Sequence, residues 1–208
     1  MTKNDLYVYA CSFGKYHDIE NSKFITEMSF PSYLGSLLEM NVVNRSKSGE
    51  NCFAIFEKIL QDIKNFKKDD IILIQWPFSN RIKNLKTKSP IFVNSKDVES
   101  RIYYKNFYLP EKEVINIIGY NSLLKELLKD RTWFYNFADG QDFIEKKCQG
   151  LQYAQDNYLP INKSLFTQFL DKELYLKDYH PNIEGNKRIA QLYYEKISKK
   201  FNFDSKST

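Results

Sequence analysis

One uninterrupted apolar run, Ile71-Ile72-Leu73-Ile74-Gln75-Trp76, limits most strongly what this chain can fold into. A strand that is apolar on both faces is typical of the centre of a parallel sheet, where helices cover both sides. Asp69 and Asp70 precede the run and Pro77 follows it, so polar and turn-forming residues bound the strand. The run therefore predicts an α/β protein.

Further strands and helices alternate along the chain. Short β-prone runs predict strands at residues 6–10, 41–44 and 132–137. Apolar residues at helical spacing predict helices at 31–40, from 52 onward, at 111–129 and at 182–200. This order, without an internal repeat, predicts a single domain over residues 1–208. We expect a three-layer α/β/α architecture with a mainly parallel central sheet.

Four segments carry no clear element of this kind. One of them, residues 138–177, should mix helical turns with loops. Residues 15–30 are mixed and polar, and we expect a loop in which His17 is exposed rather than catalytic. Residues 82–106 are long, basic and irregular, which predicts a long loop or lid, because structureless loops of this length are usually functional or disordered. Residues 204–208 should form a frayed tail.

Charge and cysteine content narrow the possible partners. The net charge is +5, but the lysines are spread along the chain, so nucleic-acid binding through the basic 82–106 segment ranks last. The 3 cysteines are widely spaced, form no metal motif and indicate a reducing compartment. No run approaches the roughly 18 apolar residues of a membrane span. We expect a cytoplasmic protein without a membrane partner, and the oligomeric state stays open.

Ser12 is the first candidate functional residue. It follows the first predicted strand directly and precedes Gly14, so it lies where open α/β sheets place their ligands. Two other interpretations exist. A lone serine is more often an ordinary turn residue, and Ala10-Cys11-Ser12-Phe13-Gly14 also approaches the Gly-x-Ser-x-Gly elbow of α/β-hydrolases. That elbow follows several strands, whereas one strand precedes Ser12, so we set it aside.

Asp178 and His180 form the second candidate. The chain has only 2 histidines, and His180 stands just before Pro181, Asn182 and the apolar period of the last predicted helix. An imidazole held on a loop against a packed helix is suited to act as a general base. On the local pattern alone, a histidine that only packs in a surface turn is an equal alternative.

The third candidate is the loop Ser48-Gly49-Glu50-Asn51, between the second predicted strand and its helix. A glycine loop in this position can direct backbone N–H groups into a cleft. An ordinary strand-to-helix connection is the alternative interpretation.

Ser12, the Gly49 loop and the Asp178/His180 segment follow one another in the order typical of the SGNH (GDSL-type) hydrolase superfamily. The chain resembles this superfamily over nearly its whole length, and the resemblance implies a flavodoxin-like sheet. The family's first block reads Gly-Asp-Ser and corresponds here to Ala10-Cys11-Ser12, with the serine kept. Gly49 corresponds to the glycine of the second block. The last block corresponds to Asp178 and His180 with the following Pro181.

The resemblance implies a serine esterase or O-acyl(acetyl)transferase that acts on a small ester, for example an acetylated carbohydrate, without a cofactor or metal. Ser12 would be the nucleophile, His180 the base and Asp178 the acid that orients it. The backbone N–H groups of Ser12 and Gly49, with a side-chain amide, would bind the oxyanion.

Two departures from the family pattern matter. The third block is Gly-x-Asn-Asp in the family, but the corresponding loop here runs from Trp76 to Arg81 and keeps no such motif in register. Asn80, or failing that Asn51, is then the candidate amide donor, and Trp76 and Arg81 are candidate substrate-binding residues. The family's acid usually lies three residues before its histidine, where this chain has Lys177. Because the first block lacks the Gly-Asp before its serine and the third block is absent, a catalytically degenerate SGNH-like binding protein is the competing hypothesis.

Overall fold

A computed structural model gives the structure of the 208-residue chain. The residues that it describes are 3–77, 82–83, 90–91, 110–138, 155–159, 174, 176 and 180–201. Most of the predicted lid at 82–106 and of residues 138–177, and the predicted tail at 204–208, lie outside the described residues. So do Asn80, Arg81 and Asp178.

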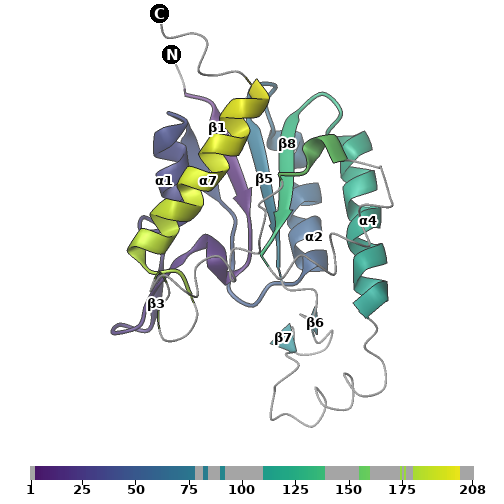
Figure 1. Ribbon diagram of the computed structural model, residues 1–208. Coiled ribbons are helices and arrows are strands. Elements are labelled where there is room, and N and C mark those ends of the chain that lie inside the picture. Colours follow the sequence, from purple (N-terminus) through teal and green to yellow (C-terminus); the bar gives the residue numbers. More distant parts are fainter. Residues whose placement is uncertain are drawn as a thin grey trace, which may run out of the picture.

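In the described part of the chain, four parallel strands form the central sheet, in the order β4-β1-β5-β8 (Figure 1). Their bounds are β1 (Asp5–Tyr9), β4 (Asn41–Asn44), β5 (Ile71–Trp76) and β8 (Thr132–Phe137). Every residue of β5 is buried, as expected of a strand with helices on both sides. The predicted parallel sheet is confirmed.

The strand order places a topological switch point between β1 and β5. The chain leaves β1 toward β4 on one side of the sheet, whereas it leaves the neighbouring β5 toward β8 on the other. The loops after β1 and β5 therefore diverge, and ligands of open α/β sheets bind at such a switch point. Ser12 lies in the 3₁₀ turn η1 (Ser12–Gly14) immediately after β1.

Among the described helices, two pairs cover the two faces of the sheet and complete the predicted three layers (Figure 1). On one face α1 (Phe30–Leu37) and α7 (Ile183–Phe201) pack on the odd-numbered side chains of β5, Ile71 and Leu73. On the other face α2 (Cys52–Asp62) and α4 (Pro110–Leu127) pack on Ile72, Ile74 and Trp76. This alternation is the two-residue period of a strand, here apolar on both sides.

Residues 15–30 contain a hairpin, so the prediction of a plain loop was wrong. Its strands β2 (Tyr16–Asp18) and β3 (Lys23–Ile25) pair antiparallel, with His17 opposite Phe24. The turn between them is stabilised by Asp18, whose carboxylate accepts hydrogen bonds from the backbone and side-chain N–H groups of Asn21. His17 is half-buried rather than exposed.

Shorter elements complete the described part of the chain: the 3₁₀ turns η2 (Ile63–Asn65) and η3 (Gln155–Asn157) and the paired strands β6 (Ile82–Lys83) and β7 (Pro90–Ile91). Among the described helices, none combines the length and apolar character needed to cross a membrane.

Candidate active site at the carboxyl end of the sheet

The turn that carries Ser12 is compact and internally bonded. The Gly14 N–H donates to the Cys11 carbonyl at 3.0 Å, and the Lys15 N–H donates to the Ser12 carbonyl at 3.1 Å. Ser12 is 2% exposed, and Cys11 is fully buried in the core. The backbone of the predicted nucleophile is therefore fixed by the turn and by the buried strand before it.

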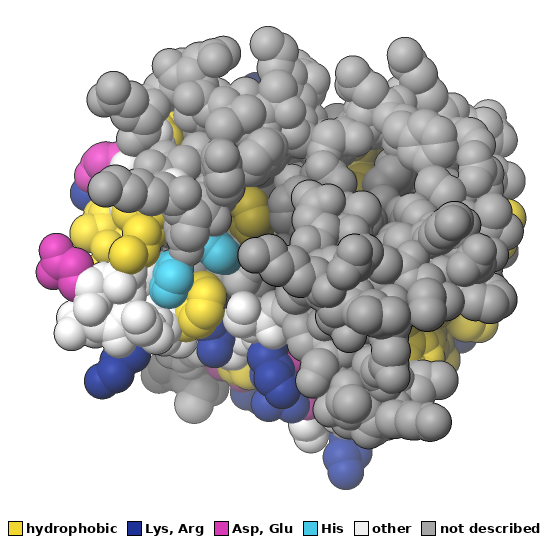
Figure 2. Space-filling model, turned by 90° about the horizontal axis from the view of Figure 1, so that it is seen from below, with side chains coloured by type: hydrophobic (Ala, Val, Ile, Leu, Met, Phe, Trp, Pro, Cys, Tyr) yellow, Lys and Arg dark blue, Asp and Glu magenta, His cyan; other side chains and the backbone are white. Residues whose placement is uncertain are grey.

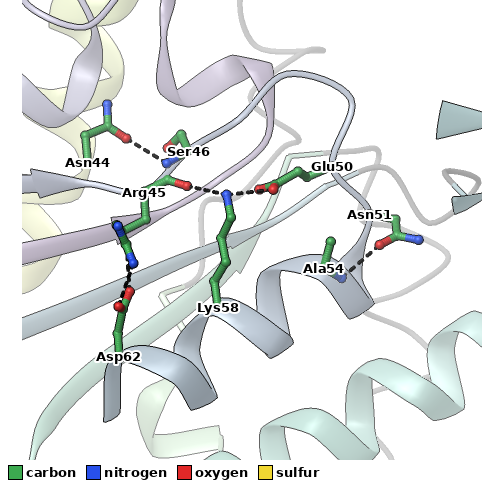
Figure 3. Close-up of polar contacts among 8 residues, drawn as sticks. All are labelled: Asn44, Arg45, Ser46, Glu50, Asn51, Ala54, Lys58 and Asp62. Carbon is green, nitrogen blue, oxygen red and sulfur yellow. Dashed lines mark hydrogen bonds and ion pairs between the residues drawn. The ribbon is translucent and has the colours of Figure 1, made fainter. Parts of the chain in front are cut away.

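The loop after β4 is tied directly to this turn. The Asn44 side chain bridges the two segments: its Nδ2 donates to the Gly14 carbonyl at 2.8 Å, and its Oδ1 accepts from the Ser46 N–H at 3.0 Å (Figure 3). A Cβ atom at position 14 would lie 2.0 Å from the Ser46 Oγ and 2.9 Å from the Ala10 Cβ. Only glycine permits this close approach.

Gly49 lies in the same loop and has a φ of 74°, in the left-handed region that favours glycine. Lys58 of α2 holds both ends of the loop, because its Nζ donates to the Arg45 carbonyl at 2.9 Å and pairs with Glu50 Oε1 at 2.6 Å (Figure 3). The Asn51 Oδ1 caps α2 by accepting from the Ala54 N–H at 2.9 Å. The cap uses the Asn51 oxygen and leaves its amide nitrogen on the side away from the helix (Figure 3).

Asp62 anchors the start of the loop to the sheet. Its carboxylate forms a two-pronged ion pair with the Arg45 guanidinium, at 2.7 and 2.6 Å, and accepts from the Tyr9 hydroxyl at 2.8 Å. Hydrogen bonding to Asp62 raises the pKa of Arg45, and burial together with the Asp62 contact raises the pKa of Tyr9. The Asp62 carboxylate thus connects α2 to both β1 and the loop after β4 through polar contacts.

The loop that carries His180 is folded onto itself before α7. The Leu176 N–H donates to the His180 carbonyl at 2.8 Å, and the Asn182 N–H donates to the Leu174 carbonyl at 2.9 Å. The Asn182 Oδ1 then caps α7 by accepting from the Gly185 N–H at 2.9 Å.

Asn186 joins this loop to the first helix. It is fully buried, its Oδ1 accepts from the Phe30 N–H at 2.8 Å, and its Nδ2 donates to the Pro181 carbonyl at 3.0 Å. The amino ends of α1 and α7 are therefore locked together beside the candidate base.

The His180 ring lies against the turn of Ser12. The ring of Phe13, the residue after Ser12, is 5.8 Å from the His180 ring between centroids. The ring of His17 is 5.4 Å away and that of Phe24 is 5.5 Å away. On the face at the carboxyl ends of the strands, the two histidines lie side by side next to apolar side chains (Figure 2). The structure thus brings together the segments of Ser12, Gly49 and His180.

A buried polar triad lies on the α7 side of the sheet, near the ends of β5 and β8. The Tyr193 hydroxyl donates to Asn136 Oδ1 at 2.6 Å and accepts from Gln75 Nε2 at 3.1 Å. Gln75 and Asn136 are register partners, and all three side chains are fully buried. Burial raises the pKa of Tyr193.

Trp76 does not line the surface of this site. Its side chain is fully buried among the residues that α2 and α4 cover, and its Nε1–H donates to Asn121 Oδ1 at 3.1 Å. Core packing accounts for this placement, and its predicted contact with a substrate stays a prediction. The roles of Asn80, Arg81 and Asp178 also stay predictions, because these residues lie outside the described part of the chain.

Sequence reasoning missed four residues that shape the site: His17, Asn44, Lys58 and Asn186. A strand that ends in asparagine before a glycine loop is a possible signal for Asn44, whereas Lys58 resembles any surface lysine of a helix.

Within the described ranges, no three His, Cys, Asp or Glu side chains lie close enough together to bind a metal ion. A surface hollow of about 480 Å³ lies at the opposite, amino end of the sheet, beside Asn4 and Thr132.

No family model matches the sequence, and no curated protein matches it either. Solved structures share its fold. The psychrotrophic esterase EstA from Pseudoalteromonas sp. matches with a TM-score of 0.60 at 12% identity, over 96% of this chain and 99% of that one. A lipolytic protein of the G-D-S-L family from Desulfitobacterium hafniense DCB-2 matches at 0.56 and 15% identity, over 92% and 98%. A carbohydrate esterase family 2 enzyme from Corynascus thermopiles matches at 0.58 and 9% identity, over 97% and 67%.

These matches show that the chain has the three-layer α/β fold of the SGNH (GDSL-type) hydrolases, as the resemblance predicted. The identities are low, in keeping with a divergent sequence.

Proposed function

We propose that the protein is a serine esterase or O-acyltransferase that acts on a small ester, with acetylated carbohydrates as the substrate class. One observation carries the proposal. The His180 ring packs on Phe13, the residue next to Ser12, although the two segments come from distant parts of the chain. The solved structures with this fold include an esterase and a carbohydrate esterase, which supports both the reaction and the substrate class.

The proposed reaction begins with attack of Ser12 Oγ on the ester carbonyl. His180 accepts the hydroxyl proton, and Asp178 orients the imidazole and stabilises the imidazolium that forms. The negative charge on the carbonyl oxygen is met by the backbone N–H groups of Ser12 and Gly49 and by the amide of Asn80 or Asn51.

Collapse of this intermediate breaks the ester bond, and the alcohol leaves with the proton from His180. Ser12 then carries the acyl group. Water resolves the acyl-enzyme in a hydrolase, and a hydroxyl group of a second substrate resolves it in a transferase.

A serine-directed phosphonate tests the proposal. EstA was solved in a form inhibited by monoethylphosphonate, which makes this class of probe a suitable choice. We expect one label per chain, on Ser12, identified by mass spectrometry of the labelled peptide. The labelling rate should rise between about pH 5 and 8, because only the neutral imidazole can accept the serine proton.

The Ser12→Ala variant is the control. Ser12→Ala should remove both the label and the burst of nitrophenol from 4-nitrophenyl acetate while leaving the melting temperature nearly unchanged. A label on Cys11 or a tyrosine, or a rate that does not respond to pH, would contradict the proposal. The competing hypothesis of a binding protein that has lost turnover would then be favoured.

A further inference from the structure

The two histidines of this chain meet at one point of the fold. His17 lies in the β2–β3 hairpin and His180 precedes α7, yet their rings are 5.4 Å apart at an interplanar angle of 71°. This is an edge-to-face contact, the arrangement that aromatic rings prefer. Nothing in the proposed reaction uses His17, so its place beside the candidate base needs another explanation.

The partner of His17 in the hairpin is a second ring. Phe24 lies opposite His17 in the register of the two strands, and the rings stack at 4.5 Å with an interplanar angle of 17°. Phe24 also meets the His180 ring edge-to-face, at 5.5 Å and 72°. A stacked cross-strand pair on a hydrogen-bonded hairpin is a rigid surface, because each ring limits the rotation of the other.

On another side, His180 contacts the Phe13 ring at 5.8 Å and 42°. Phe13 belongs to the turn of Ser12 and is 3% exposed, so it is fixed in the core. The imidazole is thus bounded by the turn that carries the nucleophile and by the stacked pair of the hairpin. A catalytic base on a loop stays aligned with the nucleophile only if neighbouring side chains restrict the orientation of its ring.

We propose that His17 and Phe24 are positioning residues, which fix the orientation of the His180 imidazole beside the turn that carries Ser12. The inference rests on the proposed function. It assigns to the β2–β3 hairpin a role in keeping the base aligned rather than in touching the substrate. The role of His17 is that of a flat ring and not of a proton carrier.

A rescue experiment tests whether His17 acts only through its flat ring. His17→Ala removes the ring, whereas His17→Phe keeps a flat ring of similar size but can carry no proton. Phe24→Ala removes the other half of the stack. Tyr16→Ala is the matched control, because neighbouring residues of a strand point to opposite faces, so Tyr16 points away from the His17 face.

The first readout is the rate constant for phosphonate labelling of Ser12, together with kcat and KM for 4-nitrophenyl acetate. His17→Ala and Phe24→Ala should lower the labelling rate and kcat by about 10- to 100-fold, the scale expected for a misaligned catalytic group. KM should change by less than about twofold, as expected when an interaction specific to the transition state is lost. His17→Phe should recover most of the rate, and Tyr16→Ala should behave as wild type.

The second readout does not depend on activity. Because the chain has only 2 histidines, a ¹H–¹³C spectrum of imidazole Cε1–Hε1 groups contains two signals, and His17→Phe identifies the one from His180. Phe24→Ala should shift and broaden that signal, since a ring current is lost and the imidazole gains rotational freedom. Tyr16→Ala should leave it in place.

The outcomes separate the two proposals. A wild-type protein that is not labelled would overturn the proposed function, and the spectrum would still report whether the hairpin orients His180. A labelled wild type with an unaffected His17→Ala variant would overturn the positioning role alone. A His17→Phe variant as slow as His17→Ala would show that the polar nitrogens of His17 matter, and an unchanged His180 signal in Phe24→Ala would exclude orientation by the hairpin.

Discussion

The ion pair of Lys58 and Glu50 allows a quantitative test of how the Gly49 loop is held. Glu50 is 9% exposed at its side chain, and its buried Oε2 atom has no hydrogen-bond partner among the described residues. Lys58 Nζ lies 2.6 Å from the other oxygen, and the Lys58 side chain is 25% exposed. Removing Lys58 would therefore leave a buried carboxylate without its neutralising partner.

Removal of one partner from a buried ion pair costs about 3–5 kcal/mol. The partial exposure of Lys58 lets water reach part of the pair, so we expect Lys58→Met to lower the unfolding free energy by about 3 kcal/mol. Glu50→Gln removes the charge but keeps the shape, and should cost about 1 kcal/mol, the scale of one hydrogen bond. The double variant should be more stable than Lys58→Met alone, because no unpaired carboxylate remains.

Urea unfolding of the wild type, both single variants and the double variant measures these values in one double-mutant cycle. The matched control is Lys187→Met, since Lys187 pairs with Glu184 at the same 2.6 Å but both side chains are largely exposed. We expect no measurable change in the control. The reasoning is refuted if Lys58→Met costs no more than Lys187→Met, or if the double variant is the least stable of the set.

Three further predictions concern the site and its support. Gly14→Ala should lower the unfolding free energy by about 1–3 kcal/mol, measured by urea unfolding, because the new Cβ would overlap Ser46 Oγ. Burial raises the pKa of Tyr193, so the stability that its bound proton contributes is complete below about pH 10 and is lost as the pH rises above that value. When the unfolding free energy is measured from about pH 9 to 12, it should fall less in Tyr193→Phe than in the wild type. An equal fall in the two proteins would contradict this. Asp178→Asn should reduce turnover of 4-nitrophenyl acetate far more than Lys177→Ala, because an amide cannot stabilise the imidazolium, and the reverse order would move the acid to another position.

The layered fold was predictable because burial on both faces leaves a strong sequence signal. The run Ile71–Trp76 contains no charged residue and was placed with its observed bounds. The strand Asn41–Asn44 was also placed with its observed bounds, although it is short, because it stands between a helix and a glycine loop. For these strands, the local sequence pattern and the burial in the folded protein favour the same secondary structure.

The hairpin that contacts His180 was missed for the opposite reason. Its strands have three residues each and mix polar with aromatic residues, so they show no period that distinguishes them from a loop. What stabilises them is the stack of His17 on Phe24 and the contact of both with His180, and that ring comes from near the other end of the chain. Contacts at this sequence distance leave no trace in a local window.

Lys58 shows a third limit of sequence reasoning. On a helical projection it belongs with the polar residues of α2, and a lysine there is normally solvated. It is half-buried because the loop after β4 folds back over the helix and places a carbonyl and a carboxylate within its reach. The role follows from the path of the loop, which residue types alone do not determine.

The hydrogen bond between the Asn186 side chain and the Phe30 backbone has a consequence for folding during synthesis. It joins residues 156 positions apart in sequence and connects α1 to α7 within their shared layer. A chain that is still emerging from the ribosome has β1 and α1 but lacks α7, so the apolar side of the sheet that α7 covers remains open to water. During that interval Ser12 has no histidine from the last loop beside it. Synthesis of α7 therefore covers the exposed core and completes the candidate site in the same step, and a chaperone that shields this surface would act on a molecule that still lacks the candidate base.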